Sequence, residues 1–400
     1  MALTFAKCFT QQEPISEAAI ARAVEVMRTG RLHRYNLVAD EQGVVAELEA
    51  SFAQYLDVPY CLALTSGGQA LQIALRAAGV KPGDAVLTNA FTLAPVPGAI
   101  DAVGGVPILV ECTENLRPDL DDLAEKANQA GYLLLSNMRG HLPDMDAIVE
   151  ICHQNNIKMI EDCAHTMGAR WNGKASGTFG LAGCFSTQTY KHMNSGEGGF
   201  LTSSDPEFMA RATVLSGSYM LYPSHGAGPD AQAFEAARYN MPNCSARMDH
   251  LRAALLLDQI DSLPDRVSRW NARYNALADG LKSVEGITVP HRPQQEEFVG
   301  SSIQFLVPQS WSAQMCEDFV KSAASRGVEI KWFGAADPRG FTSRYDSWHY
   351  AAPKPLPRTD AVLARLFDMR VPLTFSREDC GVIAEILVDE FNRATEHPIR

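Results

Sequence analysis

The feature that most constrains the fold of this chain is an alternation of amphipathic helices with short apolar strands, from about residue 44 to residue 164. Apolar residues at helical spacing predict helices over 44–56, 68–80, 120–130 and 145–156. Apolar runs between them predict strands over 60–66, 82–90, 106–111, 131–138 and 157–164. Runs such as LLLS suit a sheet that is buried on both faces. The pattern therefore predicts an α/β domain of three layers, with helices on both faces of a mainly parallel sheet.

The chain is long for one domain, since its 400 residues exceed the roughly 250–300 at which a single hydrophobic core stops growing. A segment rich in proline and glycine, 222–243, ends the alternation. Beyond it we expect helices over 248–263 and 266–284, then a smaller C-terminal α/β lobe with strands near 302–308 and 328–333 and helices near 312–326 and 376–393. The predicted division is an N-terminal arm (1–40), a large domain (41–260) and a small domain (261–400).

Charge and composition exclude several classes of protein. The formal net charge of −12 argues against a nucleic-acid partner, because such proteins need a basic stripe along the phosphate backbone. The start of the chain lacks the basic flank and apolar run of a secretory signal, and no 18 apolar residues run together. We expect no membrane span and a cytoplasmic location. Asp144 and Asp146 have no histidine at ligand spacing, so we expect helix capping there and no metal site.

The segment Thr65-Ser66-Gly67-Gly68-Gln69 joins a predicted strand to a predicted helix. Backbone N–H groups and the helix dipole converge on an anion at such a joint, and glycine lets the backbone approach a phosphate closely. Ser66 or Gln69 could add a side-chain donor. The alternative is an ordinary glycine turn that caps a helix.

Two further segments carry candidate catalytic groups. Glu161 and Asp162 end an apolar strand, where open α/β sheets place ligand-binding residues, and we choose Asp162 as the carboxylate that keeps a pyridine nitrogen protonated. His165, three residues on, could reach the same ring; a helix cap and a packed histidine are the alternatives. Lys191 follows a later strand and precedes glycines, which makes it a candidate nucleophile for a Schiff base rather than a solvated charge.

Seven segments occur in one order and at close spacing: SGGQAL, FTLAP, GHLPDMDAI, IEDCAHTMGA, FSTQTYK, GEGG and RM…AALLLDQ. Over residues 12–390 the chain resembles the DegT/StrS-type aminotransferases of the fold-type-I pyridoxal-phosphate class, which place an amino group on a nucleotide-linked keto sugar. The resemblance implies pyridoxal 5'-phosphate as cofactor and a homodimer with shared active sites. It also implies an amino donor, glutamate or glutamine, and a keto acceptor.

The resemblance implies a role for each matching residue. Gly67, Gly68 and Ser186 would bind the cofactor phosphate, and Phe91 would stack on the ring. Asp162 would bind the pyridine nitrogen, His165 would lie near the phenolic oxygen, and Lys191 would hold the cofactor as an imine. An asparagine of the neighbouring subunit completes the family's phosphate site, in a segment resembling YN-x-RM. Here Arg247 and Met248 lie further from the Tyr-Asn pair, so Asn240 or Asn243 could be the equivalent, and we favour Asn240.

Departures from the family pattern concern the substrate more than the cofactor. Gly68 stands where threonine or serine is usual, and Arg139 where a small or aromatic residue is usual. The segment 331–350 carries aromatic and basic residues in place of a Pro-Leu-His segment. Arg31, His33, Arg34 and Tyr35 form a basic and aromatic cluster that would contact a substrate anion, or else lie in a solvated arm or a dimer contact.

The leading interpretation is therefore an aminotransferase that uses Lys191. One rival is a sugar dehydratase of the same fold, in which histidine replaces the family's lysine; the lysine is kept here, although His192 follows it. The other rival is a non-catalytic pyridoxal-phosphate-binding regulator, which is disfavoured because no basic DNA-reading segment is attached.

Overall fold

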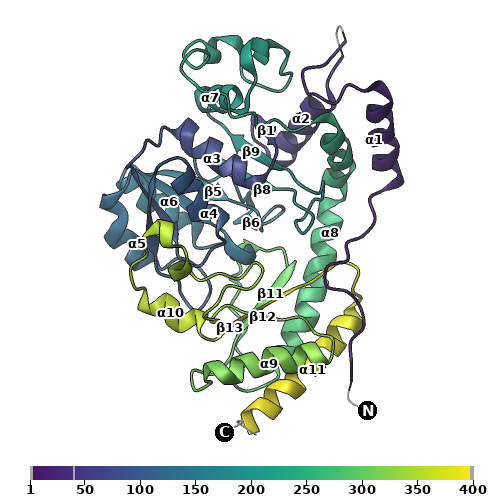
Figure 1. Ribbon diagram of the computed structural model, residues 1–400, viewed down its shortest axis with the longest axis vertical. Coiled ribbons are helices and arrows are strands. Elements are labelled where there is room, and N and C mark those ends of the chain that lie inside the picture. The colour runs from purple at the N-terminus through teal and green to yellow at the C-terminus, as the bar shows by residue number, and fades with distance from the viewer. Residues whose placement is uncertain (1–2, 39–40, 397–400) are drawn as a thin grey trace.

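The computed structural model describes residues 3–38 and 41–396, and its centre is a seven-stranded sheet (Figure 1). The strand order is β1 (Tyr60–Leu64), β9 (Gly199–Ser203), β8 (Ala182–Ser186), β5 (Lys158–Asp162), β4 (Tyr132–Ser136), β2 (Ala85–Asn89) and β3 (Val106–Val110). Strand β9 pairs antiparallel with β1 and β8, and the remaining pairs are parallel. The predicted mainly parallel α/β sheet is confirmed.

Helices cover both faces of this sheet, which explains why its strands are apolar throughout. On one face lie α3 (Gly67–Ala78), α4 (Pro95–Ala102) and α7 (Pro206–Ser216); on the other lie α2 (Val44–Leu56), α5 (Leu120–Lys126) and α6 (Met145–Gln154). Alternate residues of β1 show the division. Leu62 and Leu64 are buried with the side chains of α3 and α7, whereas Cys61 and Ala63 are buried with those of α2. Burial on two faces is the expected environment of a parallel sheet.

A single helix of 33 residues, α8 (His250–Lys282), replaces the two helices expected over 248–263 and 266–284. Pro264 lies inside it and costs one backbone hydrogen bond. The buried residues of α8 continue on both sides of the proline, from Leu256 and Ile260 to Trp270 and Leu277. Burial of this continuous apolar face offsets the lost hydrogen bond, which is why the expected break is absent.

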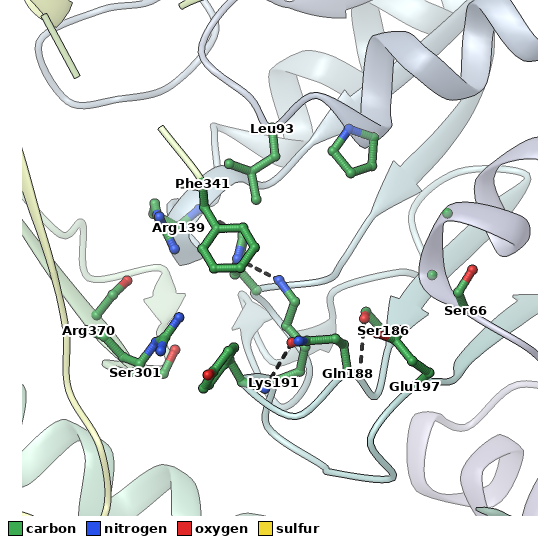
Figure 2. A pocket seen from close by; sticks show the side chains of 16 residues that line it. Ser66, Leu93, Arg139, Ser186, Gln188, Lys191, Glu197, Ser301, Phe341 and Arg370 are labelled. Carbon is green, nitrogen blue, oxygen red and sulfur yellow. Dashed lines mark hydrogen bonds between the residues drawn. The ribbon is translucent and has the colours of Figure 1, made fainter. Parts of the chain in front are cut away.

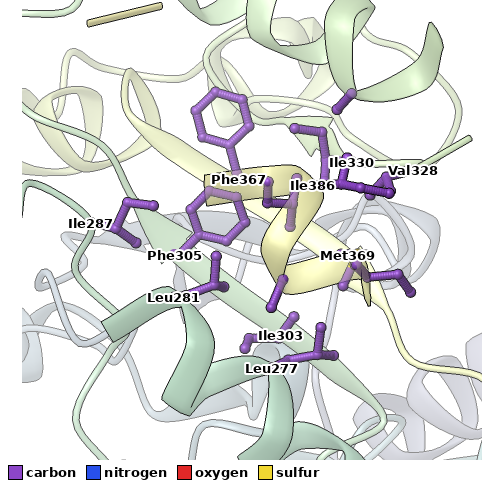
Figure 3. Close-up of a cluster of buried hydrophobic side chains, with 14 of the residues drawn as sticks. Leu277, Leu281, Ile287, Ile303, Phe305, Val328, Ile330, Phe367, Met369 and Ile386 are labelled. Carbon is purple, nitrogen blue, oxygen red and sulfur yellow. The ribbon is translucent and has the colours of Figure 1, made fainter. Parts of the chain in front are cut away.

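The C-terminal lobe is a small sheet covered by helices. Its strands pair in the order β11 (Ser302–Leu306), β13 (Leu366–Arg370) and β12 (Lys331–Trp332), and its helices are α9 (Ala313–Ser325) and α11 (Arg377–Glu396). One face of the sheet, with Ile303, Phe305 and Phe367, packs on α8, α9 and α11 to form a separate core (Figure 3). The expected smaller α/β lobe is confirmed, although its central strand β13 was not predicted.

The N-terminal segment is held against both parts of the molecule. Helix α1 (Glu17–Thr29), which the sequence analysis did not predict, packs Ala23 and Val26 against Ala254 of α8. Phe5 and Phe9 insert into the core of the C-terminal lobe. The division at residues 40 and 260 stays a prediction, and the second boundary falls inside α8. None of the described helices combines the length and apolar composition that crossing a bilayer requires.

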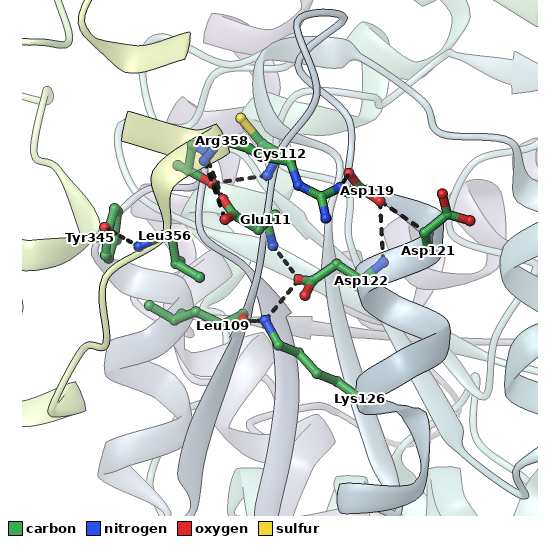
Figure 4. Close-up of polar contacts among 11 residues, drawn as sticks. Leu109, Glu111, Cys112, Asp119, Asp121, Asp122, Lys126, Tyr345, Leu356 and Arg358 are labelled. Carbon is green, nitrogen blue, oxygen red and sulfur yellow. Dashed lines mark hydrogen bonds and ion pairs between the residues drawn. The ribbon is translucent and has the colours of Figure 1, made fainter. Parts of the chain in front are cut away.

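The segment that departs from the family pattern, 331–350, packs back onto the large domain. It leads into α10 (Pro357–Leu363), whose first N–H groups are capped by the buried Glu111 at the end of β3 (Figure 4). Tyr345 and Trp348 are buried in the same cluster as Ala90 and Leu109 of the large domain. This packing places Phe341 at the mouth of the cavity described next.

Candidate functional site

A cavity of about 390 Å³ lies at the carboxyl ends of the central strands, between the two lobes (Figure 2). Parallel α/β sheets bind ligands at this edge. Six of the predicted site residues line the cavity: Ser66, Gly67, Gly68, His165, Ser186 and Lys191. Residues separated by more than 120 positions in the sequence are thus brought to one site.

The phosphate end of the cavity is the N-terminus of α3. Ser66 caps this helix, since its Oγ accepts the N–H of Gln69 at 3.1 Å. The helix's own hydrogen bonds begin with the N–H of Ala70, so the N–H groups of Gly67 and Gly68 precede them. Ser186 Oγ accepts the N–H of Gln188 at 3.3 Å and keeps its own hydrogen to donate. These groups make a set of donors suited to a phosphate.

Gly67 is required by a close approach of two chain segments. A Cβ atom at this position would lie 2.8 Å from Cβ of Ser186 and 3.3 Å from its Cα. At Gly68 the nearest atom to such a Cβ is Ser66 Oγ, at 3.8 Å. The first glycine therefore lets α3 and β8 meet, whereas the second leaves open space at the helix N-terminus.

Lys191 lies between the phosphate end and the opposite end of the cavity (Figure 2). Its Nζ lies 2.8 Å from Nε2 of His165. Burial lowers the pKa of Lys191 to about 7; Asp162 opposes this shift, and Arg139 and Arg370 add to it. Burial, with the charges of Lys191 and Arg139, also lowers the pKa of His165 well below its ordinary value.

The hydrogen bonds assign the protons of this pair. The backbone N–H of Arg139 donates to Nδ1 of His165 at 3.3 Å, so we assign the proton of the neutral ring to Nε2. Nε2–H then faces Lys191 Nζ, which accepts this hydrogen bond only as an uncharged amine. The geometry requires an unprotonated Lys191, which is the nucleophilic form of the side chain, and a pKa of about 7 makes this form abundant near neutral pH.

Of the two adjacent carboxylates, Asp162 is the one available to a ligand. Glu161 is fully buried and accepts N–H groups from Gly177, Phe179 and Gly180, so it holds a loop. Asp162 ends β5 on the other face of the strand. Burial raises the pKa of Asp162, while the N–H of Ala164, the charge of Lys191 and the hydroxyl of Ser136 oppose the shift. Asp162 is close enough to Lys191 to raise that residue's pKa, although it is not one of the cavity-lining residues.

The arrangement fits pyridoxal phosphate. The open space at Gly68 and the donors around it suit the phosphate, and the neutral amine of Lys191 suits the aldehyde. Asp162, which is close enough to Lys191 to raise its pKa, would be the partner for a protonated ring nitrogen. When bound, the cofactor supplies an electron sink for a carbanion formed at the substrate carbon.

The structure does not place Phe91 or Asn240 at the cavity. Phe91 was expected to stack on the cofactor ring, but it is buried and packs edge-on against Phe333, with ring centres 5.2 Å apart. The wall there is formed by Leu93 and Pro95. The physical reason is the altered segment after residue 330, which inserts Phe333 over Phe91. Asn240 is exposed and donates to the carbonyl of Ala236, so any role at a phosphate site requires a second subunit.

Two alternatives from the sequence analysis have other structural roles. His192 bonds through Nδ1 to the carbonyl of Met167 at 2.8 Å and through Nε2 to Ser301 at 2.9 Å, so both ring nitrogens are engaged, and His192 is not one of the cavity-lining residues. Arg34 is buried in a two-bond ion pair with Glu49, at 2.7 and 2.8 Å. It is therefore neither solvated nor in contact with the cavity.

Several lining residues were missed or left without a role: Arg139, Gln188, Tyr190, Glu197, Ser301, Phe341 and Arg370. A signal for Arg370 exists, because LFDMR alternates apolar and polar residues as a half-buried strand does. Arg139 could only be noted as a departure from the family pattern. Its left-handed backbone, with φ of 55°, is what brings its N–H to His165.

Comparison with known proteins supports this description. Residues 14–388 match the DegT/DnrJ/EryC1/StrS aminotransferase family. The dTDP-3-amino-3,4,6-trideoxy-alpha-D-glucose transaminase of Streptomyces venezuelae is 33% identical over 285 residues, which are 69% of this chain and 67% of that protein. The L-glutamine:2-deoxy-scyllo-inosose aminotransferase of Micromonospora echinospora is 30% identical over 283 residues, 68% of this chain and 66% of that protein. For another relative from Micromonospora echinospora the matched segment spans only 54% of its length.

The fold agrees with solved structures. The aminotransferase TlmJ from Streptoalloteichus hindustanus superposes with a TM-score of 0.81, at 22% identity, over 96% of this chain and 98% of that one. At this identity the likeness shows the fold alone. The match over residues 14–388 carries the assignment and confirms the predicted class of enzyme and its cofactor, pyridoxal phosphate. The chain belongs to the DegT/DnrJ/EryC1/StrS aminotransferase family.

Proposed function

We propose that this enzyme moves an amino group from glutamate or glutamine to the keto group of a sugar, with Lys191 as the group that holds the cofactor and moves the proton. The acceptor is a keto sugar, free or nucleotide-linked; the Streptomyces venezuelae relative is named for a nucleotide-linked sugar. The observation that carries the proposal is the contact of Lys191 Nζ with His165, which presents a neutral amine inside the cavity.

The side chains around Lys191 supply the remaining steps. Gly67, Gly68 and Ser186 bind the phosphate and fix the position of the ring. Asp162 keeps a proton on the ring nitrogen, since a carboxylate beside that nitrogen stabilises its protonated form. In its uncharged form, Lys191 Nζ, which lines the cavity, would remove and return the proton at the reacting carbon of a bound substrate. His165 holds the amine in place between these events.

The position of His192 supports transamination over dehydration. In the dehydratases that the fold also supports, histidine takes the place of the family's lysine. Here Lys191 faces the cavity, and both ring nitrogens of His192 are occupied by Met167 and Ser301. His192 is thus a structural residue that fixes the loop after β8.

Reduction of the cofactor-loaded protein with borohydride, followed by peptide mass spectrometry, tests the role of Lys191. The cofactor mass is expected on the peptide that contains Lys191, and a Lys191→Ala protein should carry none. Glutamate or glutamine should then convert the bound cofactor to its amine form with stoichiometric release of the oxo acid. If the protein binds the cofactor but never exchanges the α-proton of any amino acid in deuterated water, it is a non-catalytic pyridoxal-phosphate-binding regulator and the proposed function is wrong.

We propose further that the enzyme is a homodimer in which Asn240 reaches the phosphate site of the partner subunit. The supporting observation is a group of exposed apolar side chains on the same segment: Tyr219 (60%), Met220 (53%) and Tyr239 (75%). Such a group on a folded surface marks an interaction site. The expected cytoplasmic location stays a prediction.

Mixed dimers test this arrangement. Lys191→Ala and Asn240→Ala chains are each expected to be inactive alone, and mixing should restore activity because one of the two shared sites is then intact. If Asn243→Ala rather than Asn240→Ala behaves this way, Asn243 is the equivalent residue. A monomer in solution at assay concentration contradicts the proposal.

A further inference from the structure

The polar face of the small sheet lies behind the end of the cavity opposite the phosphate site, and its residues Ser302 and Arg370 line the cavity. Gln304 of β11, Asp368 of β13 and Lys331 of β12 are paired in register across the three strands. Ser302 and Arg370 are the next pair on the same face, since side chains alternate with a period of two. The opposite face, with Phe305 and Phe367, belongs to the lobe's core.

Cationic groups outnumber anionic groups at this end. Arg139 forms an ion pair with Asp368, 2.8 Å from Nη2 to Oδ2, and Gln304 occupies the other oxygen of that carboxylate at 2.8 Å. The guanidinium of Arg370 lies over the ring of Tyr190, 3.7 Å from its centre. The ammonium of Lys331 lies 5.3 Å from the ring centre of Phe341. Asp368 is the carboxylate paired with Arg139, and Glu329 is close enough to act on Lys331, so three cations face two anions.

These cations lie close to the reacting nitrogen. Figure 2 shows Arg139, Arg370 and Ser301 on one side of Lys191, and Ser66 and Ser186 on the other. Arg139 and Arg370 line the cavity, and both are close enough to lower the pKa of Lys191. Burial lowers the pKa of Arg370 and of Lys331; the charge of Arg139 adds to both shifts, and the carboxylate of Asp368 opposes them.

Donor and acceptor occupy one site in turn in a transamination, so both meet the same cations. A neutral acceptor would displace water from Arg370 and leave its charge with the ring of Tyr190 but without an ion pair to any described carboxylate. An acceptor with a carboxylate would instead form charge-assisted hydrogen bonds there, of the bidentate kind that arginine favours. The site thus discriminates against neutral acceptors as well as favouring acidic ones.

We propose that the acceptor carries a carboxylate near its keto carbon, and that Arg370, with Arg139, binds it. The acceptor is then an acidic keto sugar or keto acid rather than a neutral keto cyclitol. The cavity volume favours a small acceptor. At about 390 Å³ it lies near the lower end of the roughly 300–1,000 Å³ typical of ligand pockets, and it must also hold the cofactor.

This proposal rests on the proposed transamination, and the two are tested in separate steps. The cofactor-loaded enzyme is first aminated with glutamate and freed of excess donor. Failure at that step contradicts the proposed function. The aminated enzyme is then mixed with three acceptors: a keto uronic acid, its neutral hydroxymethyl counterpart, and a nucleotide-linked neutral keto sugar. The recovery of the original cofactor absorbance gives the rate.

The keto uronic acid is expected to react at least about tenfold more efficiently than its neutral counterpart. Arg370→Gln should lower the rate with the acid by roughly 10- to 100-fold more than it lowers the rate with the neutral compound. Arg393→Gln, an arginine exposed on α11, is the matched control and should change neither rate. The proposal is overturned if the neutral hydroxymethyl compound or the nucleotide-linked neutral keto sugar reacts faster than the keto uronic acid. It is also overturned if Arg370→Gln lowers the rates with the acid and with its neutral counterpart equally.

A binding measurement gives a readout that does not depend on turnover. Glutarate, a dicarboxylate with no group to transfer, is titrated into the cofactor-loaded enzyme by calorimetry. Binding is expected to weaken by about tenfold or more in Arg370→Gln, to weaken with added salt, and to be unchanged in Arg393→Gln. If glutarate binds wild type and Arg370→Gln equally, or binds neither, the cationic end is not a carboxylate site.

Discussion

Lys191 Nζ lies 2.8 Å from Nε2 of His165, and the backbone N–H of Arg139 fixes the opposite nitrogen of that ring as an acceptor. The relationship makes the lysine an acceptor of a hydrogen bond and therefore an uncharged amine. Three separate segments cooperate in this result: the loop after β4, the loop after β5 and the loop after β8. The reactivity of the lysine is thus a property of the folded site.

Covalent capture of pyridoxal phosphate by the cofactor-free protein should therefore depend on pH near neutrality. Because burial lowers the pKa of Lys191 to about 7, the uncharged fraction, and with it the capture rate, should rise through a midpoint near pH 7. The charge of Asp162 raises this pKa, so Asp162→Asn should move the midpoint down. The charge of Arg370 lowers it, so Arg370→Gln should move the midpoint up. A midpoint near 10.5, the ordinary lysine value, contradicts the assignment.

The two glycines of the phosphate turn should respond oppositely to substitution by alanine. Gly67→Ala places a methyl group 2.8 Å from Cβ of Ser186, so overpacking should lower the free energy of unfolding by about 1–3 kcal/mol and weaken cofactor binding. Gly68→Ala meets no atom closer than 3.8 Å and lies in the first turn of α3, so it should raise stability by up to about 1 kcal/mol. Denaturant unfolding with cofactor titration measures both. If the two variants change the free energy of unfolding and cofactor binding in the same way, the packing role proposed for Gly67 is wrong.

Much of the large domain could be predicted because its signals are local. The helix over 44–56 was predicted at its observed bounds, since its apolar spacing is regular. Strand β13 and the continuity of α8 could not be predicted, because both depend on burial against segments distant in the sequence. Among site residues, those in the joints after β1, β5 and β8 were identified. The position of Phe91 was not, because Phe333, more than 240 residues later, covers it.

Acid should destabilise the protein through Glu49. Burial alone would raise the pKa of this carboxyl, but Arg34 and His225 hold it at about 2. A carboxyl whose folded pKa is depressed stabilises the fold above its unfolded pKa, here 4.5, and loses that contribution as pH falls toward 2. The free energy of unfolding should therefore decline between pH 4.5 and 2.

Glu49→Gln tests the source of this decline. Loss of one partner of a buried pair should destabilise the protein by about 3–5 kcal/mol at pH 7 and flatten the pH dependence below 4.5. Glu47→Gln on the same helix, whose side chain is 46% exposed, should cost less than about 1 kcal/mol. Thermal unfolding across pH measures both variants. If the free energy of unfolding of Glu49→Gln still declines with pH below 4.5 as steeply as that of the wild type, other groups cause the acid unfolding.

The buried carboxylate of Glu111 ties α10, and with it the segment that carries Phe341, to the large domain (Figure 4). It accepts the N–H of Thr359 at 2.7 Å, the hydroxyl of Thr359 at 2.6 Å and the N–H of Arg358 at 3.3 Å. Glu111→Ala leaves these donors without their partner and should cost about 1–3 kcal/mol. Amide hydrogen exchange over 341–363 should accelerate as that segment loosens.

A matched control separates this effect from a general loss of negative charge. Glu125→Ala removes an exposed carboxylate from α5 nearby and should change stability by less than about 0.5 kcal/mol, without faster exchange over 341–363. Because Phe341 lines the cavity, Glu111→Ala should also raise KM for the acceptor while covalent capture of the cofactor is unaffected. Unchanged exchange over 341–363 in Glu111→Ala would show that the apolar cluster around Tyr345 and Trp348 holds the segment without the carboxylate.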